Sequence, residues 1–254
     1  LRLNKLIVLW DDNNISIDGE ISMSDSTDQI ARFKASGWNT LRVDGHKPAE
    51  ISEAIEKAKA SEKPTMIACK TTIGFGSPNK AGTAKVHGSP LGDEEIAATR
   101  KALGWTSPAF EVPDAVYADW HAIAARGADM RKAWDGRLNA SARKADFLAA
   151  QDGSNRAGLA DAMAAYKAGL AADKPKVATR KSSEMALEVV NATVPGMVGG
   201  SADLTGSNNT RTSKMTTITR DNYAGDYMYY GVREHGMAAA MNGISLHGGL
   251  RPYG

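Results

Sequence analysis

The sequence contains a single cysteine, Cys69, among 254 residues, and this scarcity excludes an internal disulfide framework. Cys69 stands in an apolar run, so we expect it to be a small, buried core residue. No apolar run approaches the roughly 20 residues that a membrane-spanning helix needs. The opening residues also lack the pattern of a secretory signal peptide. Together these absences lead us to expect a soluble, cytoplasmic protein with no membrane partner.

The sequence also lacks an excess of charge of either sign. Lys and Arg number 31 against 29 Asp and Glu, which leaves a net charge of +2, and the charges are interspersed. Such a balance gives no electrostatic reason to expect nucleic acid or an anionic membrane as a partner. What is present is a hydrophobic share of 42%, enough for a real core, in a chain long enough for one large domain or two small ones.

The first hundred residues alternate between strand and helix patterns. The expected elements, in order, are a strand at 6–10, a helix at 26–36, a strand at 40–43, a helix at 50–60 and a strand at 65–70. This order predicts a parallel sheet with right-handed crossovers. A long loop rich in glycine follows at 71–92, and loops of this length are typically functional or disordered.

The rest of the chain divides into a helical stretch and a second α/β region. Residues 113–172 are expected to be mostly helical, with only a sparse apolar stripe, and we interpret them as a connector. The elements expected after it are a helix at 183–193, strands at 197–200 and 227–230, and a helix at 233–246. The last seven residues show neither a helix nor a strand pattern, and Leu1 is not an initiator methionine. We therefore interpret the chain as an internal fragment of a longer protein.

Carboxylates and amides follow the first expected strand. The run Leu6–Trp10 leads directly into Asp11, Asp12 and Asn13. Ligands bind where the strands of an open parallel sheet end, and these side chains carry hard oxygen ligands, so the segment is a candidate rim for a Mg²⁺-bound phosphate. The Asn13 side chain and the carbonyl of Ile15 have the spacing to occupy two neighbouring positions around the cation. An ordinary strand-to-loop transition with Asx turns is the alternative.

A histidine lies among the glycines of the long loop. His87 directly precedes Gly88, and glycines allow the backbone to approach a ligand closely. A loop imidazole can donate a hydrogen bond to a phosphate or move protons near neutral pH. The alternative is an exposed histidine without a function.

Two further segments favour anion binding. Gly199–Asn209 combines glycines, hydroxyls and amides after an expected strand, which suits anion binding through backbone N–H groups. Arg180 precedes an expected helix and could pair with a phosphate in a two-pronged geometry. A salt bridge in solvent is the commoner role for a single arginine.

Glu234 stands at the start of a helix rich in alanine and methionine. A helix N-terminus favours an ionised carboxylate, whereas burial against an aromatic ligand favours the protonated form. A carboxylate under such opposed influences is a candidate acid or base. The alternative is an acid that only interacts with the helix dipole.

Taken in order, these segments resemble the transketolases, which are thiamine-diphosphate enzymes, over essentially the whole chain. The most specific strings are Lys70–Thr83 and Gly231–Met237, with Asn242–Gly249 following the second. The resemblance implies an α/β fold with two thiamine-diphosphate-binding-type domains, both incomplete, whose sheets are mostly parallel and which a helical connector joins.

The resemblance also implies domain boundaries. The C-terminal part of a diphosphate-binding domain would span residues 1–112, a helical connector 113–174 and the N-terminal part of a pyrimidine-binding domain 175–254. A Gly-Asp-Gly segment that supplies a metal carboxylate would precede Leu1. The aromatic residue that stacks on the pyrimidine would follow Gly254.

Cofactor and metal contacts are implied residue by residue. Asn13 and the carbonyl of Ile15 match the ligands of Mg²⁺ (or Ca²⁺). Ile73 matches a loop residue that packs near the thiamine diphosphate. Asp203, and less closely Leu204, match residues close to the thiamine ring.

Catalytic and substrate contacts are implied in the same way. His87 matches a loop histidine that touches both the diphosphate and the donor sugar. Arg180 and Ser207 match groups that hold the sugar phosphate. Glu234 matches the glutamate that contacts N1′ of the aminopyrimidine, which makes Glu234 and His87 the expected catalytic residues.

The implied function is transfer of a two-carbon ketol unit from a ketose phosphate to an aldose phosphate through a thiamine-bound carbanion, in the pentose phosphate pathway or the Calvin cycle. The implied assembly is a homodimer with the cofactor at the subunit interface. Another thiamine enzyme, such as a dihydroxyacetone or deoxyxylulose phosphate synthase, is an alternative, as is a non-catalytic fragment or interaction protein. The isolated chain is expected to be inactive, because half of its metal site would be missing.

Overall fold

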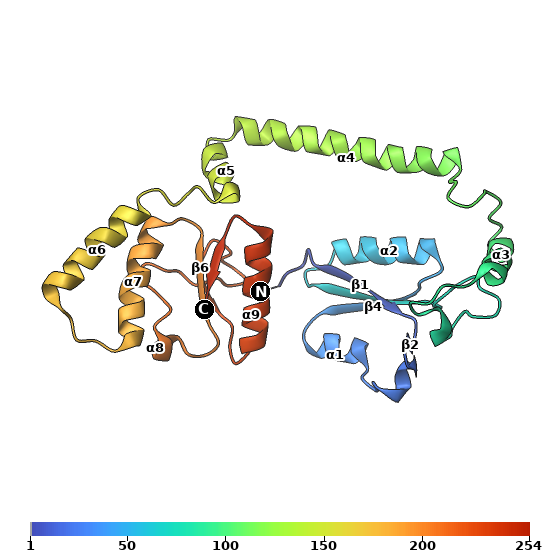
Figure 1. The fold of residues 1–254 in the computed structure, drawn as a ribbon, viewed down its shortest axis with the longest axis horizontal. Coiled ribbons are helices and arrows are strands. Elements are labelled where there is room, and N and C mark those ends of the chain that lie inside the picture. The colour runs from blue at the N-terminus through green and yellow to red at the C-terminus, as the bar shows by residue number, and fades with distance from the viewer. Residues whose placement is uncertain (1) are drawn as a thin grey trace. The chain divides into compact units, whose positions relative to one another are not determined.

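The computed structural model describes residues 2–254, and they form two compact units. The first unit ends at Trp120, and the second comprises His121–Gly254. Each unit contains a three-stranded parallel sheet, which confirms the predicted α/β class (Figure 1). The domain boundaries expected after residues 112 and 174 stay a prediction.

The first sheet has the strand order β1-β5-β4. Its strands are β1 (Ile7–Asp12), β4 (Asn39–Asp44) and β5 (Thr65–Lys70), and all pair in parallel, as the sequence predicts. The helices α1 (Gln29–Ala35) and α2 (Pro48–Lys59) connect them and cover opposite faces of the sheet (Figure 1).

The core of the first unit surrounds the central strand. Residues 65–69 of β5 are all buried, because a central parallel strand is covered on both faces and therefore consists of a continuous apolar run. Cys69 is 8% exposed, which confirms its expected core position, and burial raises the pKa of its thiol. Ala54 and Ala58 of α2 are buried against this strand, which allows the helix to lie close to the sheet.

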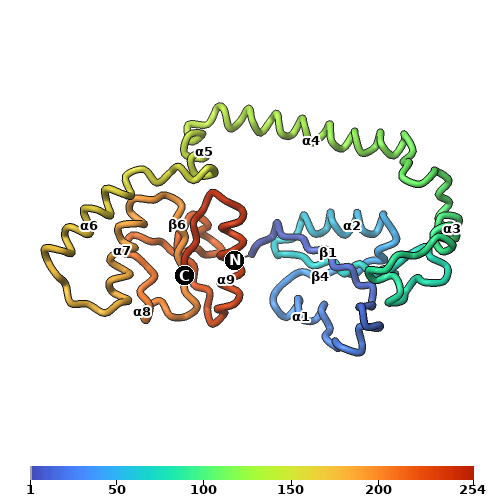
Figure 2. The backbone as a smooth tube through the Cα atoms, viewed as in Figure 1, coloured from blue at the N-terminus to red at the C-terminus, as the bar shows by residue number. Residues whose placement is uncertain are grey.

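Short elements in the first unit escaped the sequence patterns. The strands β2 (Ile15–Ser16) and β3 (Gly19–Glu20) pair antiparallel, and the 3-10 turn η1 (Ile21–Met23) follows. The long loop contains a 3-10 turn, η2 (Ala84–Val86), before α3 (Asp93–Ala102). Each of these turns and strands has two or three residues, too few for a period of 2 or 3.6 to become visible. The tube in Figure 2 follows the long loop up to α3.

The expected helical connector is helical. It contains α4 (Asp114–Ala140), α5 (Lys144–Asp152) and α6 (Leu159–Asp173). Among the helices of residues 2–254, none is both long enough and apolar enough to cross a membrane.

The second sheet has the strand order β7-β6-β8. Its strands are β6 (Met197–Ser201), β7 (Tyr227–Tyr229) and β8 (Arg251–Tyr253), and its helices are α7 (Thr179–Thr193), α8 (Thr205–Asn208) and α9 (Glu234–His247). Figure 1 shows α7 and α9 on either side of β6.

Two expectations for the second unit are wrong. Helix α7 begins at Thr179 rather than at Ser183, so Arg180 lies within its first turn and does not precede it. The closing residues, expected to contain no strand, form β8 beside β6 in the register Met197 to Arg251. Three residues show no recognisable alternation, and only pairing with β6 makes them a strand.

Candidate functional site

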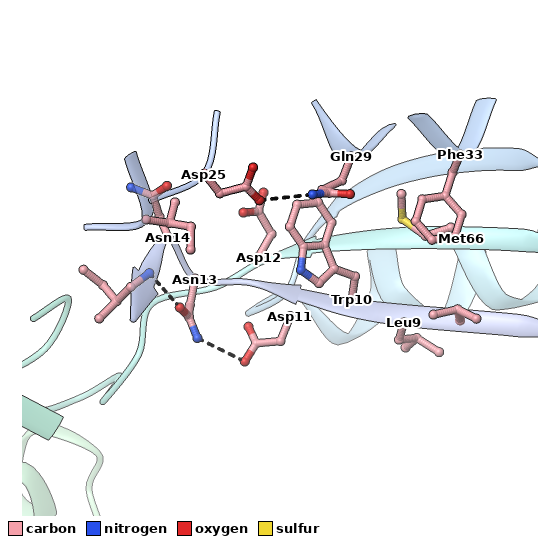
Figure 3. A pocket seen from close by; sticks show the side chains of 13 residues that line it. Leu9, Trp10, Asp11, Asp12, Asn13, Asn14, Asp25, Gln29, Phe33 and Met66 are labelled. Atoms are coloured by element: carbon pink, nitrogen blue, oxygen red, sulfur yellow. Dashed lines mark hydrogen bonds between the residues drawn. The ribbon is translucent and has the colours of Figure 1, made fainter. Parts of the chain in front are cut away.

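The first group of predicted site residues lies where the strands of the first sheet end. The register pairs Asp12 with Lys70 and Asp44 with Lys70, so all three strands leave the sheet at one edge. A cavity of about 440 Å³ follows β1 to this edge, and Figure 3 shows Trp10 and Asp12 among its lining side chains. Carboxyl ends of parallel strands are where open α/β sheets bind ligands.

Asn13 and Ile15 belong to one Asx turn. The Asn13 Oδ1 atom accepts a hydrogen bond from the Ile15 backbone N–H at 2.9 Å. Asn14, between them, adopts a left-handed conformation with φ of 65°, which asparagine tolerates better than most residues. This is the Asx turn that was the alternative interpretation of the segment, and the Ile15 group beside the Asn13 oxygen is the N–H, so the two-ligand spacing stays a prediction.

Asp11, near the end of β1, links this turn to the neighbouring strand β5. The Thr71 hydroxyl, directly after β5, donates a hydrogen bond to the Asp11 carboxylate. That carboxylate also accepts a long hydrogen bond of 3.5 Å from the Asn13 Nδ2 group, shown in Figure 3. The nitrogen of the Asn13 amide therefore faces Asp11, and its oxygen faces Ile15. Thr71 was not among the predicted site residues, although its position after a parallel strand could have indicated it.

The donor set suits a hard cation but is incomplete within the described chain. An asparagine oxygen and a backbone carbonyl are ligands that Mg²⁺ and Ca²⁺ accept. The Asn13 oxygen has two lone pairs, and the Asx turn uses one, so the second is available for a cation. Within residues 2–254, however, no group of three or more His, Cys, Asp or Glu side chains is placed to hold a metal ion. The two oxygens fit part of a Mg²⁺ site, and a carboxylate ligand would have to be added.

The long loop carries Ile73 and His87 from the same sheet edge. Ile73 is half-buried, and its carbonyl accepts a hydrogen bond from the Gly82 N–H at 2.8 Å. His87 ends the η2 turn, where its N–H donates to the Ala84 carbonyl at 3.0 Å. The His87 side chain is exposed, so its imidazole is accessible to a ligand.

A second histidine, His46, holds the start of this loop. Its Nε2 atom accepts a hydrogen bond from the Thr72 N–H at 2.8 Å, and its ring stacks on Phe75 with centroids 4.0 Å apart. His46 follows β4 as Thr71 follows β5, at the same edge of the sheet. Sequence reasoning missed it, although its position just after a strand was a usable signal.

The second group of predicted residues follows β6. Ser201 is fully buried at the end of this strand, and its hydroxyl accepts hydrogen bonds from the Leu204 N–H at 3.0 Å and the Asn208 Nδ2 at 3.3 Å. These bonds shape the turn into α8. Asp203 adopts a left-handed conformation with φ of 68°, and the Leu204 side chain is 49% exposed. Both side chains are therefore presented at the surface of this turn.

The glycines before this turn have a packing role. A side chain at Gly199 would collide with the ring of Tyr253, and one at Gly200 would collide with the ring of Tyr230. The Gly199 N–H already donates to the Asp226 carbonyl at 2.9 Å, so it is not free for an anion. The two glycines leave room for aromatic rings next to β6, and the Gly199 N–H is not available for the expected anion binding.

The predicted substrate and catalytic residues of the second unit lie within helices. Arg180 lies in the first turn of α7, and Ser207 lies in α8, which packs against α7. The contact includes a hydrogen bond from Asn209 Nδ2 to Glu184 Oε2 at 3.1 Å. Glu234 is the first residue of α9, as predicted. The side chains of Arg180, Ser207 and Glu234 are all exposed.

A buried tyrosine network beneath the Ser207 turn was not predicted. The hydroxyl of Tyr227, which is 0% exposed, hydrogen-bonds to the Thr205 hydroxyl at 2.9 Å and to the Thr210 hydroxyl at 2.8 Å. Tyr253 donates to the Thr210 carbonyl at 2.8 Å, and burial raises the pKa of its phenol. This network fixes α8 to β7 and so supports the turn that carries Ser207.

Two family models match the chain. One is described as "Transketolase, thiamine diphosphate binding domain" and matches residues 1–158. The other is described as "Transketolase, pyrimidine binding domain" and matches residues 175–254.

Curated relatives and solved structures agree with the family models. The chain is 60% identical over 254 residues to a transketolase of Cereibacter sphaeroides and 52% identical over 255 residues to one of Rhodobacter capsulatus, and spans 38% of each. It is similar to the structure of a transketolase from Leishmania mexicana, with a TM-score of 0.87, 36% identity, and coverage of 99% of this chain and 38% of that one. It is also similar to a transketolase from Pichia stipitis in complex with sedoheptulose 7-phosphate, with a TM-score of 0.81, 35% identity, and coverage of 98% of this chain and 38% of that one.

Proposed function

The chain belongs to the transketolase family, and on that premise we propose that it supplies part of an enzyme that transfers two-carbon ketol units between sugar phosphates. The observation that supports the proposal is that two predicted binding segments start at the same edge of the first sheet. The Asx turn of Asn13 and Ile15 and the loop that bears Ile73 and His87 both start there, beside each other through the Asp11–Thr71 hydrogen bond.

The first unit would bind the diphosphate end of the cofactor. Thiamine diphosphate, when bound, supplies an electron sink for the two-carbon unit. The Asn13 Oδ1 atom and the Ile15 carbonyl would hold the Mg²⁺ (or Ca²⁺) that accompanies the diphosphate. Ile73 would cover the cofactor with apolar surface. His87 would donate a hydrogen bond to a diphosphate oxygen and move a proton at a sugar hydroxyl, which its exposed imidazole permits.

The second unit would bind the thiamine end and the sugar phosphate. Glu234 would hold a proton at N1′ of the aminopyrimidine, for which the first position of α9 leaves its carboxyl accessible. Asp203 and Leu204 would line the thiamine ring. Arg180 and Ser207, on the adjacent helices α7 and α8, would bind the phosphate of the sugar.

The proposed substrates and the proposed assembly follow from the roles of the two units. Sugar phosphates are the proposed substrates, and related transketolases have been solved with xylulose 5-phosphate and sedoheptulose 7-phosphate. We propose a cytoplasmic homodimer with a cofactor at the subunit interface, acting in pentose phosphate metabolism. In such an assembly, one subunit provides the diphosphate side of the site and the other provides the pyrimidine side.

A chimera tests the proposal. In the transketolase of Cereibacter sphaeroides, the matched segment is replaced by residues 1–254 of this chain. We expect the chimera to transfer ketol units from xylulose 5-phosphate to ribose 5-phosphate, with a requirement for thiamine diphosphate and Mg²⁺. Glu234→Gln and His87→Ala versions are the matched controls and should lose most of this activity. A folded chimera that binds thiamine diphosphate without transferring ketol units would contradict the proposal.

The isolated chain gives a second test. We expect no ketol transfer by the purified 254-residue chain, because the described residues offer only part of a metal site. Transfer at a measurable rate would contradict that expectation.

A further inference from the structure

The long loop is anchored by one buried carboxylate outside the predicted site. Glu95, in the first turn of α3, is 7% exposed. One oxygen of its carboxylate accepts hydrogen bonds from the Ser77 hydroxyl and, at 2.8 Å, from the Asn79 N–H. The other oxygen accepts from the Asn79 Nδ2 group at 2.9 Å. Three donors from one turn of the loop therefore converge on a single side chain of α3.

The carboxylate is held in its charged form by these donors. Hydrogen bonds from Ser77 and Asn79 lower the pKa of Glu95 to about 2, and the charge of Lys80 acts in the same direction. Burying a carboxylate costs free energy unless it is hydrogen-bonded, so the position of Glu95 in α3 depends on the donors of the loop turn, and the turn depends on Glu95.

The anchor extends to the far end of the loop through Lys80. The Ser77 hydroxyl accepts a hydrogen bond from the Lys80 N–H at 3.3 Å. The Lys80 ammonium donates to the Leu91 carbonyl at 2.6 Å, across the segment that contains His87. The Lys80 carbonyl accepts from the Thr83 hydroxyl at 2.7 Å, just before the η2 turn. The chain on both sides of His87 is thus bound to one lysine.

The same frame holds Ile73. Its carbonyl bonds to Gly82, as described above, and the adjacent Gly74 has a left-handed φ of 65°. A Cβ atom at Gly74 would lie only 3.0 Å from a methyl group of Val86, the neighbour of His87. Close packing of Gly74 on Val86 therefore brings the Ile73 and His87 segments together in one compact loop.

We propose that Glu95 is a positioning residue of the active site, which acts through Ser77, Asn79 and Lys80 to place Ile73 and His87 for the cofactor and the sugar. The proposal rests on the function proposed above. Glu95 itself would touch neither the substrate nor the cofactor. Its effect on the reaction would arise entirely from the loop it holds.

Hydrogen exchange of the 254-residue chain tests the anchor independently of any activity. Glu95→Ala leaves the Ser77 and Asn79 donors unpaired, and we expect backbone amides in residues 73–91 to exchange about tenfold faster or more. Amides of β5 should exchange at the wild-type rate. The matched control is Glu94→Ala, which removes the exposed neighbouring acid and should leave the loop unchanged. Equal exchange in the two variants would overturn the proposal.

Smaller changes separate a positioning role from a folding defect. Asn79→Ala removes only the 2.9 Å bond and should accelerate loop exchange less than Glu95→Ala does. Glu95→Gln keeps the size of the side chain but loses the charge and replaces one accepting oxygen with an NH2 group, so its loop should exchange at a rate between those of the wild type and Glu95→Ala. Wild-type exchange in Glu95→Gln would mean that neither the charge nor the second accepting oxygen holds the turn, and the hydrogen-bond account would be wrong.

The chimera tests the catalytic consequence. Displacement of a catalytic group by about 1 Å costs on the order of a hundredfold in rate, so Glu95→Ala should lower kcat/KM by about that factor. In a His87→Ala background the same substitution should cost much less, because the group it positions is gone. A purely structural role would give additive losses.

These experiments distinguish failure of the positioning role of Glu95 from failure of the proposed function. A folded wild-type chimera without ketol transfer would contradict the proposed function and, with it, the positioning role. An active chimera with additive effects of Glu95→Ala and His87→Ala would contradict the positioning role alone.

Discussion

The two sheets of this chain have the same architecture and hold their site residues in opposite ways. Both have three parallel strands, and in both the predicted residues follow the strands or start the helices. In the first unit, the Asx turn of Asn13 and the Glu95 anchor hold the binding segments from within the chain. In the second unit, Arg180 and Glu234 are exposed, and the buried hydrogen bonds lie around Tyr227, beneath the turn that carries Ser207.

The difference follows from the atoms that each unit would present. A cation demands oxygen atoms at fixed positions, and a backbone carbonyl such as that of Ile15 can be positioned only by the conformation of the chain. In the proposed site, Arg180 and Glu234 would reach a ligand with long side chains, whose ordering on binding would cost some side-chain entropy. The first unit therefore holds its loops by hydrogen bonds within the chain, whereas the second presents exposed side chains above a buried, hydrogen-bonded base.

The largest effect should come from breaking that buried base. Tyr227→Ala removes a fully buried ring together with its two hydroxyl contacts, and should destabilise the second unit by about 3–5 kcal/mol. Tyr229→Ala is the matched control on the same strand, since its ring is half exposed, and should cost about 1 kcal/mol. Hydrogen exchange of the β6 amides measures both values, because it reports on one unit at a time. Similar losses in the two variants would mean that the network does not support the second unit.

The next largest effect, on cofactor affinity, should come from the Asx turn of the first unit. In the chimera, Asn13→Ala removes a proposed cation ligand and the Asx turn at once. Affinity for thiamine diphosphate at limiting Mg²⁺ should fall about tenfold or more, as measured by calorimetry. Asn14→Gly is the control, because glycine adopts the left-handed conformation of this position without strain. Unchanged affinity in Asn13→Ala would remove Asn13 from the metal site.

The Glu95 anchor should respond to pH in one direction only. The folded chain lowers the pKa of Glu95 from 4.5 to about 2, so its stabilisation is complete above the ordinary pKa and is lost as the pH falls through the folded value. Pepsin should therefore cut the loop of the wild-type chain progressively faster as the pH falls from about 4 to about 2. In Glu95→Gln, loop cleavage relative to that of an unstructured peptide should not change over this range. Parallel pH profiles in the two chains would contradict the anchor.

The smallest effect on stability should come from the exposed side chains of the second unit. Glu234→Gln should change the unfolding free energy by no more than about 0.5 kcal/mol, since the side chain lies at the surface. In the chimera, however, it should lower kcat by about a hundredfold or more, the usual contribution of an acid–base group. If Glu234→Gln instead changed the unfolding free energy strongly and kcat only slightly, Glu234 would have a structural role and not a catalytic one.

Much of the fold could be predicted because its signals are local. The buried run of β5, with Cys69 inside it, has the pattern of a central parallel strand, and Glu234 stands where α9 begins. The Asx turn at Asn13 joins residues only two apart, so residue type and spacing were enough to indicate it. The three-residue strand β8 could not be predicted, because its existence depends on a partner strand some fifty residues earlier.

The sequence by itself determined the order of the longer elements, the buried strand and the loops on which site residues stand, because periodicity and turn chemistry act over a few residues. Only the tertiary structure decided which of the three acids of α3 turns inward, that Thr71 meets Asp11, and that His46 accepts from Thr72. Those choices join residues 18 to 60 positions apart, as in the pairs Ser77–Glu95 and Asp11–Thr71. They depend on which side chains packing excludes from water, and no local pattern in the chain carries that information.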